Sequence, residues 1–262
     1  MREVSCQLDV VVHRSADLVL TVAPHTAYEV SERLDVRLDG QPVDVIERVD
    51  TFGTRRHCFQ AGLGRLTVAY AATVTAHRTA GPQPGDDLTY LRPSRYCDSD
   101  RLVNVAQSLF AESAPARDTV GAIRRWTLES IQYAPGTTDH LDGATEVFLS
   151  RRGVCRDTAH LLTAFARAMG IPARVAAVYA PGLVPMDFHA VSEVLIDGIW
   201  WIVDGTGLAP RGSMVRIAAG RDAADIAFLD AIRGQIELVS MTVDARADVL
   251  PHDDGVLAVA FS

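Results

Sequence analysis

The sequence contains no lysine, so all 25 of its basic side chains belong to arginine. The 33 acidic residues outnumber them and give the 262-residue chain a formal net charge of −8. Binding to nucleic acid or to an anionic membrane surface needs a basic patch on the protein. The acidic balance therefore argues against both kinds of partner.

Cysteine is also scarce. The four cysteines are widely spaced and form no Cys-x-x-Cys pair: Cys6, Cys58, Cys97 and Cys155. This spacing argues against a zinc ribbon and a dense disulfide framework. The sequence also lacks the apolar run of about 18 residues that a membrane span requires. Charges interrupt positions 1–15, where a secretory signal would be continuously apolar, so a reducing cytoplasm is the expected location.

The chain does contain enough apolar residues, 48% of the total, for a substantial core. Over residues 4–78, apolar and polar positions alternate in short runs, as in half-buried strands. The segments at 39–40 and 62–64 have the composition of hairpin turns. We predict an antiparallel β-sandwich domain over residues 1–80, followed by a boundary in the Gly- and Pro-rich stretch 79–87.

Beyond this boundary the apolar residues follow helical spacing first and strand-like spacing afterwards. The predicted elements are helices near 102–110, 120–127 and 155–169, then strands at 174–179, 188–196 and 199–203. Helices followed by strands within one unit indicate an α+β fold rather than a parallel βαβ sheet. We assign this second domain to residues 88–262.

Cys155 follows Gly153 and Val154 and opens the third predicted helix. Its sulfur should therefore face the free N–H groups and the positive dipole end of that helix, which favours the nucleophilic thiolate. A lone cysteine is more often a small buried apolar residue. The position therefore needs a second, independent observation.

That observation comes from a predicted hairpin. The Asp-Gly pair at 197–198 is a strong two-residue turn signal, and such a turn fixes the register of the strands on either side. The register places Asp204 diagonally across from His189, about 7–8 Å away between backbones, a span that a carboxylate and an imidazole can bridge. A carboxylate on one imidazole nitrogen leaves the other free to take a proton from a thiol. The alternative is a surface ion pair.

These residues lie in two blocks, GVCRDTAHLLTAFARAMGIPARV and MDFHAVSEVLIDGIWWIVDGT. Together the blocks resemble the core of the bacterial transglutaminase-like superfamily, over about residues 90–230. The resemblance implies a papain-like α+β core, preceded by an N-terminal β domain, in which Cys155 is the nucleophile, His189 the base and Asp204 the group that orients the histidine. The sequence departs from many members at Val191, where they have tryptophan, and in reading Asp-Gly-Thr for Asp-Pro-Thr.

The resemblance further implies acyl transfer through a thioester on a peptide, protein or small amide substrate, with no metal or other cofactor. Attack on the thioester by water would make the protein a peptidase or amidase, and attack by an amine would make it a transglutaminase. We favour hydrolysis, because water needs no dedicated acceptor site. If glutamine is joined to lysine, no lysine of this chain can be the acceptor. The alternative from another class is a non-catalytic protein-binding module, and the oligomeric state stays open.

Other polar residues near the nucleophile carry weaker signals. His160 lies five residues beyond Cys155, which is neither i+3 nor i+4 on a helix, so we expect it to pack. A zinc site from Cys155, Asp157, His160 and His189 would match none of the usual ligand spacings. Asp157 suits the positive end of its helix. Tyr133 could donate to an oxyanion, but an ordinary core position is the commoner role of such a tyrosine.

Overall fold

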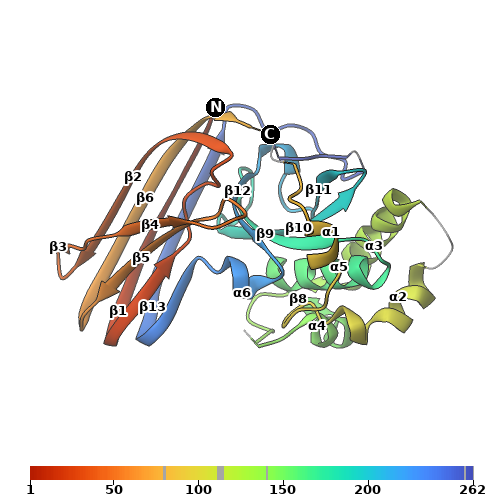
Figure 1. Ribbon diagram of the computed structural model, residues 1–262, viewed down its shortest axis with the longest axis horizontal. Helices are drawn as coiled ribbons and strands as arrows, with labels where there is room; N and C mark the ends of the chain where they lie inside the picture. Colours follow the sequence, from red (N-terminus) through yellow and green to blue (C-terminus); the bar gives the residue numbers. More distant parts are fainter. Residues whose placement is uncertain (79–80, 111–114, 140, 257, 262) are drawn as a thin grey trace.

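The computed structural model describes the whole chain except residues 79–80, 111–114, 140, 257 and 262. A large curled antiparallel sheet lies beside a unit of helices that pack on a smaller antiparallel sheet (Figure 1). The predicted α+β class is thereby confirmed, but the first domain is one curled antiparallel sheet and not the predicted two-sheet sandwich. No helix of the described residues is long and apolar enough to cross a membrane.

The large sheet and the small sheet use different parts of the chain. The large sheet contains β1 (Arg2–Leu20), β2 (Tyr28–Leu38), β3 (Gln41–Pro42), β4 (Ile46–Val49), β5 (Arg55–Ala61), β6 (Gly64–His77) and β13 (Leu229–Ala247). The small sheet has the order β11 (Ile199–Val203), β10 (Phe188–Ile196), β9 (Ala173–Tyr179) and β12 (Val215–Gly220). A short parallel pair consists of β7 (Gln132–Tyr133) and β8 (Arg152–Gly153).

All the helices lie between β6 and β13 in the sequence. They are α1 (Asp86–Thr89), α2 (Val103–Phe110), α3 (Ala116–Ser130), α4 (Ala144–Ser150), α5 (Cys155–Ala168) and α6 (Ala223–Ile226), with 3-10 turns η1 (Ser99–Arg101) and η2 (Arg211–Ser213). The predicted starts of β10, β11 and α5 agree with the structure, whereas α4 and β12 lack a clear period in the sequence and were not predicted.

The period-2 pattern of the first 80 residues buries one face of the large sheet. Every second residue of β1 from Val4 to Val12 is buried, as is every second residue of β6 from Leu66 to Val74. The sheet curls because β1 pairs with β6 through its first half and with β5 through its second half. The predicted turn at 39–40 is confirmed, since the residues on either side of it pair in β2 and β3.

The predicted hairpin turn at 62–64 is wrong. β5 and β6 pair with successive parts of the same edge of β1, both antiparallel to it, so the chain continues in one direction through this segment. Gly64 instead permits a close approach, because a Cβ atom there would lie 2.3 Å from the Asp39 carboxylate. A glycine marks where the backbone departs from a regular strand, but it does not say whether the chain reverses.

The last long strand belongs to the first sheet. The sequence prediction places residues 229–247 in the α+β unit, but β13 pairs with β1 along its whole length, from Arg2 opposite Ala247 to Leu20 opposite Leu229. Two strands so distant in the sequence share no turn, so no local pattern reveals their pairing. The large sheet is therefore completed by a segment from beyond the helices and the small sheet.

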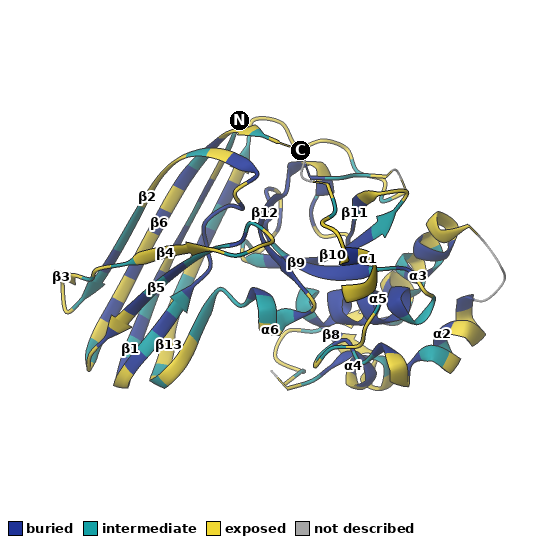
Figure 2. Ribbon diagram, viewed as in Figure 1, coloured by how far each residue is buried: buried dark blue, intermediate teal, exposed yellow. Residues whose placement is uncertain are grey.

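The position of α5 against the small sheet prepares the candidate site. Residues 157–167 of this helix are all buried, and Figure 2 shows α5 and β9 as a mostly buried layer. The Ser192 hydroxyl of β10 donates to the Ala159 carbonyl of α5 at 3.0 Å, and it also contacts the Thr163 hydroxyl at 2.9 Å. These buried hydrogen bonds fix the helix against the strand that carries His189.

Candidate active site

The N-terminus of α5 presents Cys155 at its first helical position, half-buried. Asp157 fixes this end, because its carboxylate accepts the Val154 N–H at 2.9 Å, as an N3 acidic residue does in a capping box. Arg156 pairs with the same carboxylate at 2.7 Å. Gly153 makes this packing possible, since a Cβ atom there would lie 2.6 Å from the Cβ of Asp157.

The hairpin of β10 and β11 brings a base and a carboxylate together. Its turn residues, Asp197 and Gly198, have φ angles of 54° and 75°, as a type I′ turn requires. The strands then pair as predicted, from Ile196 opposite Ile199 onwards. The Nε2 atom of His189 lies 3.1 Å from Oδ2 of Asp204, and both side chains are only 1% exposed. The predicted contact between these two side chains is confirmed.

Asp204 is held by residues other than its histidine partner. Its Oδ1 atom accepts both the backbone N–H and the hydroxyl of Thr206, each at 2.7 Å. On the main chain, Arg124 of α3 donates through Nε to the Asp204 carbonyl at 2.9 Å. The Asp-x-Thr spacing is a known local turn motif and could have indicated the role of Thr206, but nothing in the sequence pointed to Arg124.

The electrostatics link all three predicted site residues. Burial alone would lower the pKa of His189, but hydrogen bonding to Asp204 and to Cys155 outweighs it and raises this pKa to about 10. Burial likewise raises the pKa of Asp204, yet the contacts with His189 and Thr206 leave it below its usual value. His189 therefore lies between the sulfur and the carboxylate as a protonated imidazole over the neutral pH range.

The other three cysteines lie in different surroundings, and all four thiols are free. Burial raises the pKa of Cys6 to about 11 and that of Cys97 to about 12. Cys58 is half-buried within β5. Buried thiols such as Cys6 and Cys97 are poor nucleophiles, and Cys58 lies within a strand, so Cys155 is distinguished by its helix N-terminus and its histidine neighbour.

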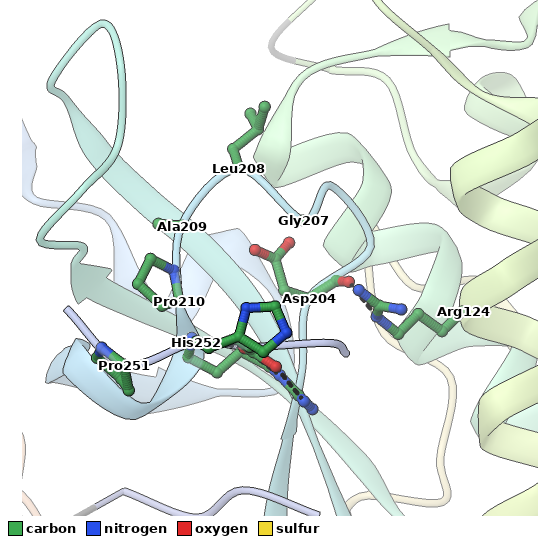
Figure 3. Close-up of a pocket in the computed structure, with 10 residues that line it drawn as sticks. Arg124, Asp204, Gly207, Leu208, Ala209, Pro210, Pro251 and His252 are labelled. Atoms are coloured by element: carbon green, nitrogen blue, oxygen red, sulfur yellow. Dashed lines mark hydrogen bonds and ion pairs between the residues drawn. The ribbon is translucent and has the colours of Figure 1, made fainter. Parts of the chain in front are cut away.

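A cavity of about 260 Å³ lies on the Asp204 side of this group (Figure 3). Its wall is formed by Arg124, by the loop that follows β11 and by residues 251–253 from near the end of the chain. Figure 3 shows the His252 ring and the Asp204 side chain both at this wall. Cys155 and His189 are not part of the lining. Of the three predicted site residues, only Asp204 lines this cavity.

The remaining candidates differ in outcome. His160 is buried, accepts the Ala223 N–H at 3.1 Å and stacks on Tyr96 with ring centroids 5.3 Å apart, which is the expected packing role. Tyr133 is 45% exposed, so its expected core position is wrong. Burial and the charge of Cys155 both raise the pKa of Tyr133, and Tyr133 pairs in β7 with Gly153 of β8, two residues before Cys155. Among the described ranges, no three His, Cys, Asp or Glu side chains are placed to hold a metal ion.

Both the sequence and the fold are similar to those of known proteins. Residues 103–205 match the transglutaminase-like superfamily. A solved structure from Cytophaga hutchinsonii, provisionally described as a cysteine protease, has a TM-score of 0.91 and 31% sequence identity over 100% of this chain and 97% of that chain. The chain belongs to the transglutaminase-like superfamily. An uncharacterized protein of Mycobacterium leprae is 30% identical over 159 residues, 56% of this chain and 57% of that relative, so the matched region spans little more than half of the relative's length.

Proposed function

We propose that the protein is a cysteine-dependent hydrolase that forms a thioester between Cys155 and the acyl group of a peptide, protein or small amide. The observation that carries this proposal is the continuous contact from Cys155 through His189 to Asp204 at the N-terminus of α5. In such an arrangement, a helix N-terminus favours the thiolate and a carboxylate stabilises the imidazolium. The description of the Cytophaga hutchinsonii relative as a cysteine protease supports the same class.

In the proposed reaction, the Cys155 thiolate attacks the carbonyl carbon and a tetrahedral oxyanion forms. The imidazolium of His189 then gives its proton to the leaving amine as the C–N bond breaks, which leaves a thioester. Water attacks the thioester while His189 takes its proton, and the carboxylic acid and the thiolate are released. The first N–H groups of α5 have no intrahelical acceptor and can bind the oxyanion. Tyr133, an exposed residue that interacts electrostatically with Cys155, is the proposed side-chain donor.

Transfer to an amine is the second candidate outcome, because the same thioester reacts with either nucleophile. We propose hydrolysis as the main reaction and the cytoplasm as its location. We propose no nucleic acid or membrane partner, because the chain has an excess of acidic side chains. A water molecule needs only the base His189, whereas an amine acceptor needs a binding site of its own.

Mass spectrometry of the intact protein tests this proposal. The protein is mixed with a panel of activated esters, amides and peptides, and acyl adducts are counted in the parent, in Cys155→Ala and in Cys58→Ala. We expect adducts in the parent and in Cys58→Ala but none in Cys155→Ala. Adding an amine then partitions the product between acid and amide, which separates hydrolysis from amine transfer. If no substrate gives an adduct and all four thiols react equally slowly with iodoacetamide, the protein is a non-catalytic binding module.

A further inference from the structure

Asp187 lies two residues before His189, just ahead of the first residue of β10. Its side chain is exposed, whereas that of His189 is buried. Two peptide units separate the Cα atoms of Asp187 and His189, so these atoms lie within about 7 Å of each other. Asp187 is therefore an exposed carboxylate next to the buried histidine of the proposed triad.

The Asp187 carboxylate interacts electrostatically with the proposed catalytic histidine. Its side chain reaches solvent but is partly desolvated by its surroundings, which raises its pKa, and the Phe188 N–H and the charge of His189 only partly offset this effect. The pKa of Tyr133 is raised by burial, by Cys155 and, next, by Asp187. The charge of Asp187 thus interacts with His189 and with Tyr133.

The Asp187 carboxylate forms no ion pair with an arginine among the described residues. Its Oδ1 atom accepts the N–H of the adjacent Phe188 at 2.7 Å, and this is its one hydrogen bond within the described ranges. The nearest arginine along α5, Arg156, is engaged with Asp157 at 2.7 Å. One carboxylate oxygen of Asp187 is therefore free to bind a cation that arrives from solvent.

The charge of the site does not depend on where the triad proton lies. Cys155 and His189 sum to zero whether they are thiol and imidazole or thiolate and imidazolium, so Asp204 and Asp187 leave a charge of −2. Arg124, which donates to the Asp204 carbonyl, reduces this to −1. A negative site disfavours anionic substrates and attracts cationic ones.

We propose that Asp187 selects substrates that carry a primary ammonium or a guanidinium group near the reacting carbonyl or on the incoming amine. This specificity rests on the proposed function. Such a group would form a charge-assisted hydrogen bond with the free carboxylate oxygen while the carbonyl carbon lies at the Cys155 sulfur. Asp187 then acts as a specificity-determining residue, and the chemistry itself stays with the triad.

Charged thiol reagents test the proposal without a known substrate. Two methanethiosulfonates of similar size, one with a trimethylammonium and one with a sulfonate group, modify Cys155 in the parent, in Asp187→Asn, in Asp187→Arg and in the control Asp44→Asn. Asparagine keeps the acceptor for the Phe188 N–H, and Asp44 is an exposed acidic residue of the large sheet domain. The rates are measured at low salt by intact mass.

We expect the cation-to-anion rate ratio to fall about tenfold in Asp187→Asn, because one unit charge at about 7 Å in water changes each rate about threefold. The ratio should fall further in Asp187→Arg and stay at the parent value in Asp44→Asn. Equal ratios in the parent and in Asp187→Asn, with Cys155 still reactive, would overturn the specificity and leave the proposed function standing. An unreactive Cys155 would overturn both.

A second experiment shows which part of the substrate carries the cation. It compares arginine esters with citrulline esters as acyl donors, and cadaverine with pentylamine as acyl acceptors. A loss of arginine preference in Asp187→Asn assigns the group to the acyl donor. A loss of cadaverine preference assigns it to the acceptor. If neither preference changes, Asp187 does not determine specificity.

Discussion

Two ionic clusters lie four residues apart on strand β10, and they differ in their access to the surface. At one end, His189 contacts Asp204 and the half-exposed Cys155. Farther along, Glu193 is fully buried between Arg174, at 2.8 Å, and Arg216, at 3.1 Å. Both clusters are buried and paired, so neither burial nor pairing distinguishes a reactive site from a structural one.

The difference lies in what each cluster leaves unsatisfied. The oxygens of Glu193 are engaged by two arginines, and Arg174 also stacks on Trp200, with its guanidinium carbon 4.0 Å from the ring centroid. Within the described ranges, the ion-pair partners of Glu193 are arginines, which stay charged at any ordinary pH. His189, by contrast, has one neighbour that is half-exposed and able to exchange a proton. A perturbed pKa marks a functional candidate when such access accompanies it.

The largest expected effect is on the reaction rate of the cluster of Cys155, His189 and Asp204, which we call the reactive cluster because it is the proposed active site. Asp204→Asn keeps the shape of the side chain but removes the charge that orients and stabilises the imidazolium, so the rate of thioester formation should fall about 10⁴-fold. Single-turnover acylation, together with a circular dichroism spectrum that shows an intact fold, checks this. An unchanged rate would remove Asp204 from the mechanism and would make the two clusters equivalent.

The structural cluster should respond in stability instead. Glu193→Gln removes the anion between two buried arginines, and leaving such charges uncompensated costs about 3–5 kcal/mol. Urea unfolding measures the loss, with the exposed Glu129→Gln of α3 as the control. The alkylation rate of Cys155 in the folded variant should stay near that of the parent. A stable variant with a slow Cys155 would reverse the assignment of the two clusters.

The pH dependence of stability should separate the clusters as well. The folded-state pKa of His189, about 10, lies above its ordinary value of about 6.5. Its protonated form therefore stabilises the fold fully below pH 6.5, and this stabilisation is lost as the pH rises through 10. The free-energy difference in unfolding between the parent and His189→Asn should shrink over that range. The corresponding difference for Glu193→Gln should stay constant, since neither Glu193 nor its arginines titrate there. A constant His189 difference would contradict the raised pKa.

The smallest expected effect concerns the helix start beside the reactive cluster. Gly153→Ala brings a Cβ atom to 2.6 Å from the Cβ of Asp157, so the cap must shift at a cost of about 1–2 kcal/mol. Alkylation of Cys155 should slow because the helix end moves. Gly121→Ala in α3 is the matched control, since no heavy atom lies within 4 Å of its added Cβ, and alanine there favours the helix. If both variants behave alike, close packing at Gly153 does not position the sulfur.

The contacts that the sequence predicted correctly depend on local geometry. The turn at 197–198 fixes the pairing of neighbouring strands, so the contact between His189 and Asp204 follows from counting residues. The start of α5 follows from Gly153 and the helical period after it. The direction of the chain at 62–64 depends on the distant strand β1, and so does the place of β13. The exposure of Asp187 likewise depends on the surface around it, which sequence spacing does not contain.

The return of β13 to β1 also fixes an order of events during synthesis. β1 leaves the ribosome about 200 residues before β13, so one of its edges gains its partner only after the residues of β13 have been added. The helices and the small sheet, by contrast, can assemble from contacts much nearer in sequence. Pairing over so long a stretch is slow, and an open strand edge invites pairing with other chains in the meantime. Newly made protein is therefore vulnerable to aggregation at the open edge of β1, which lies in the large sheet, away from the helical unit that contains α5 (Figure 1).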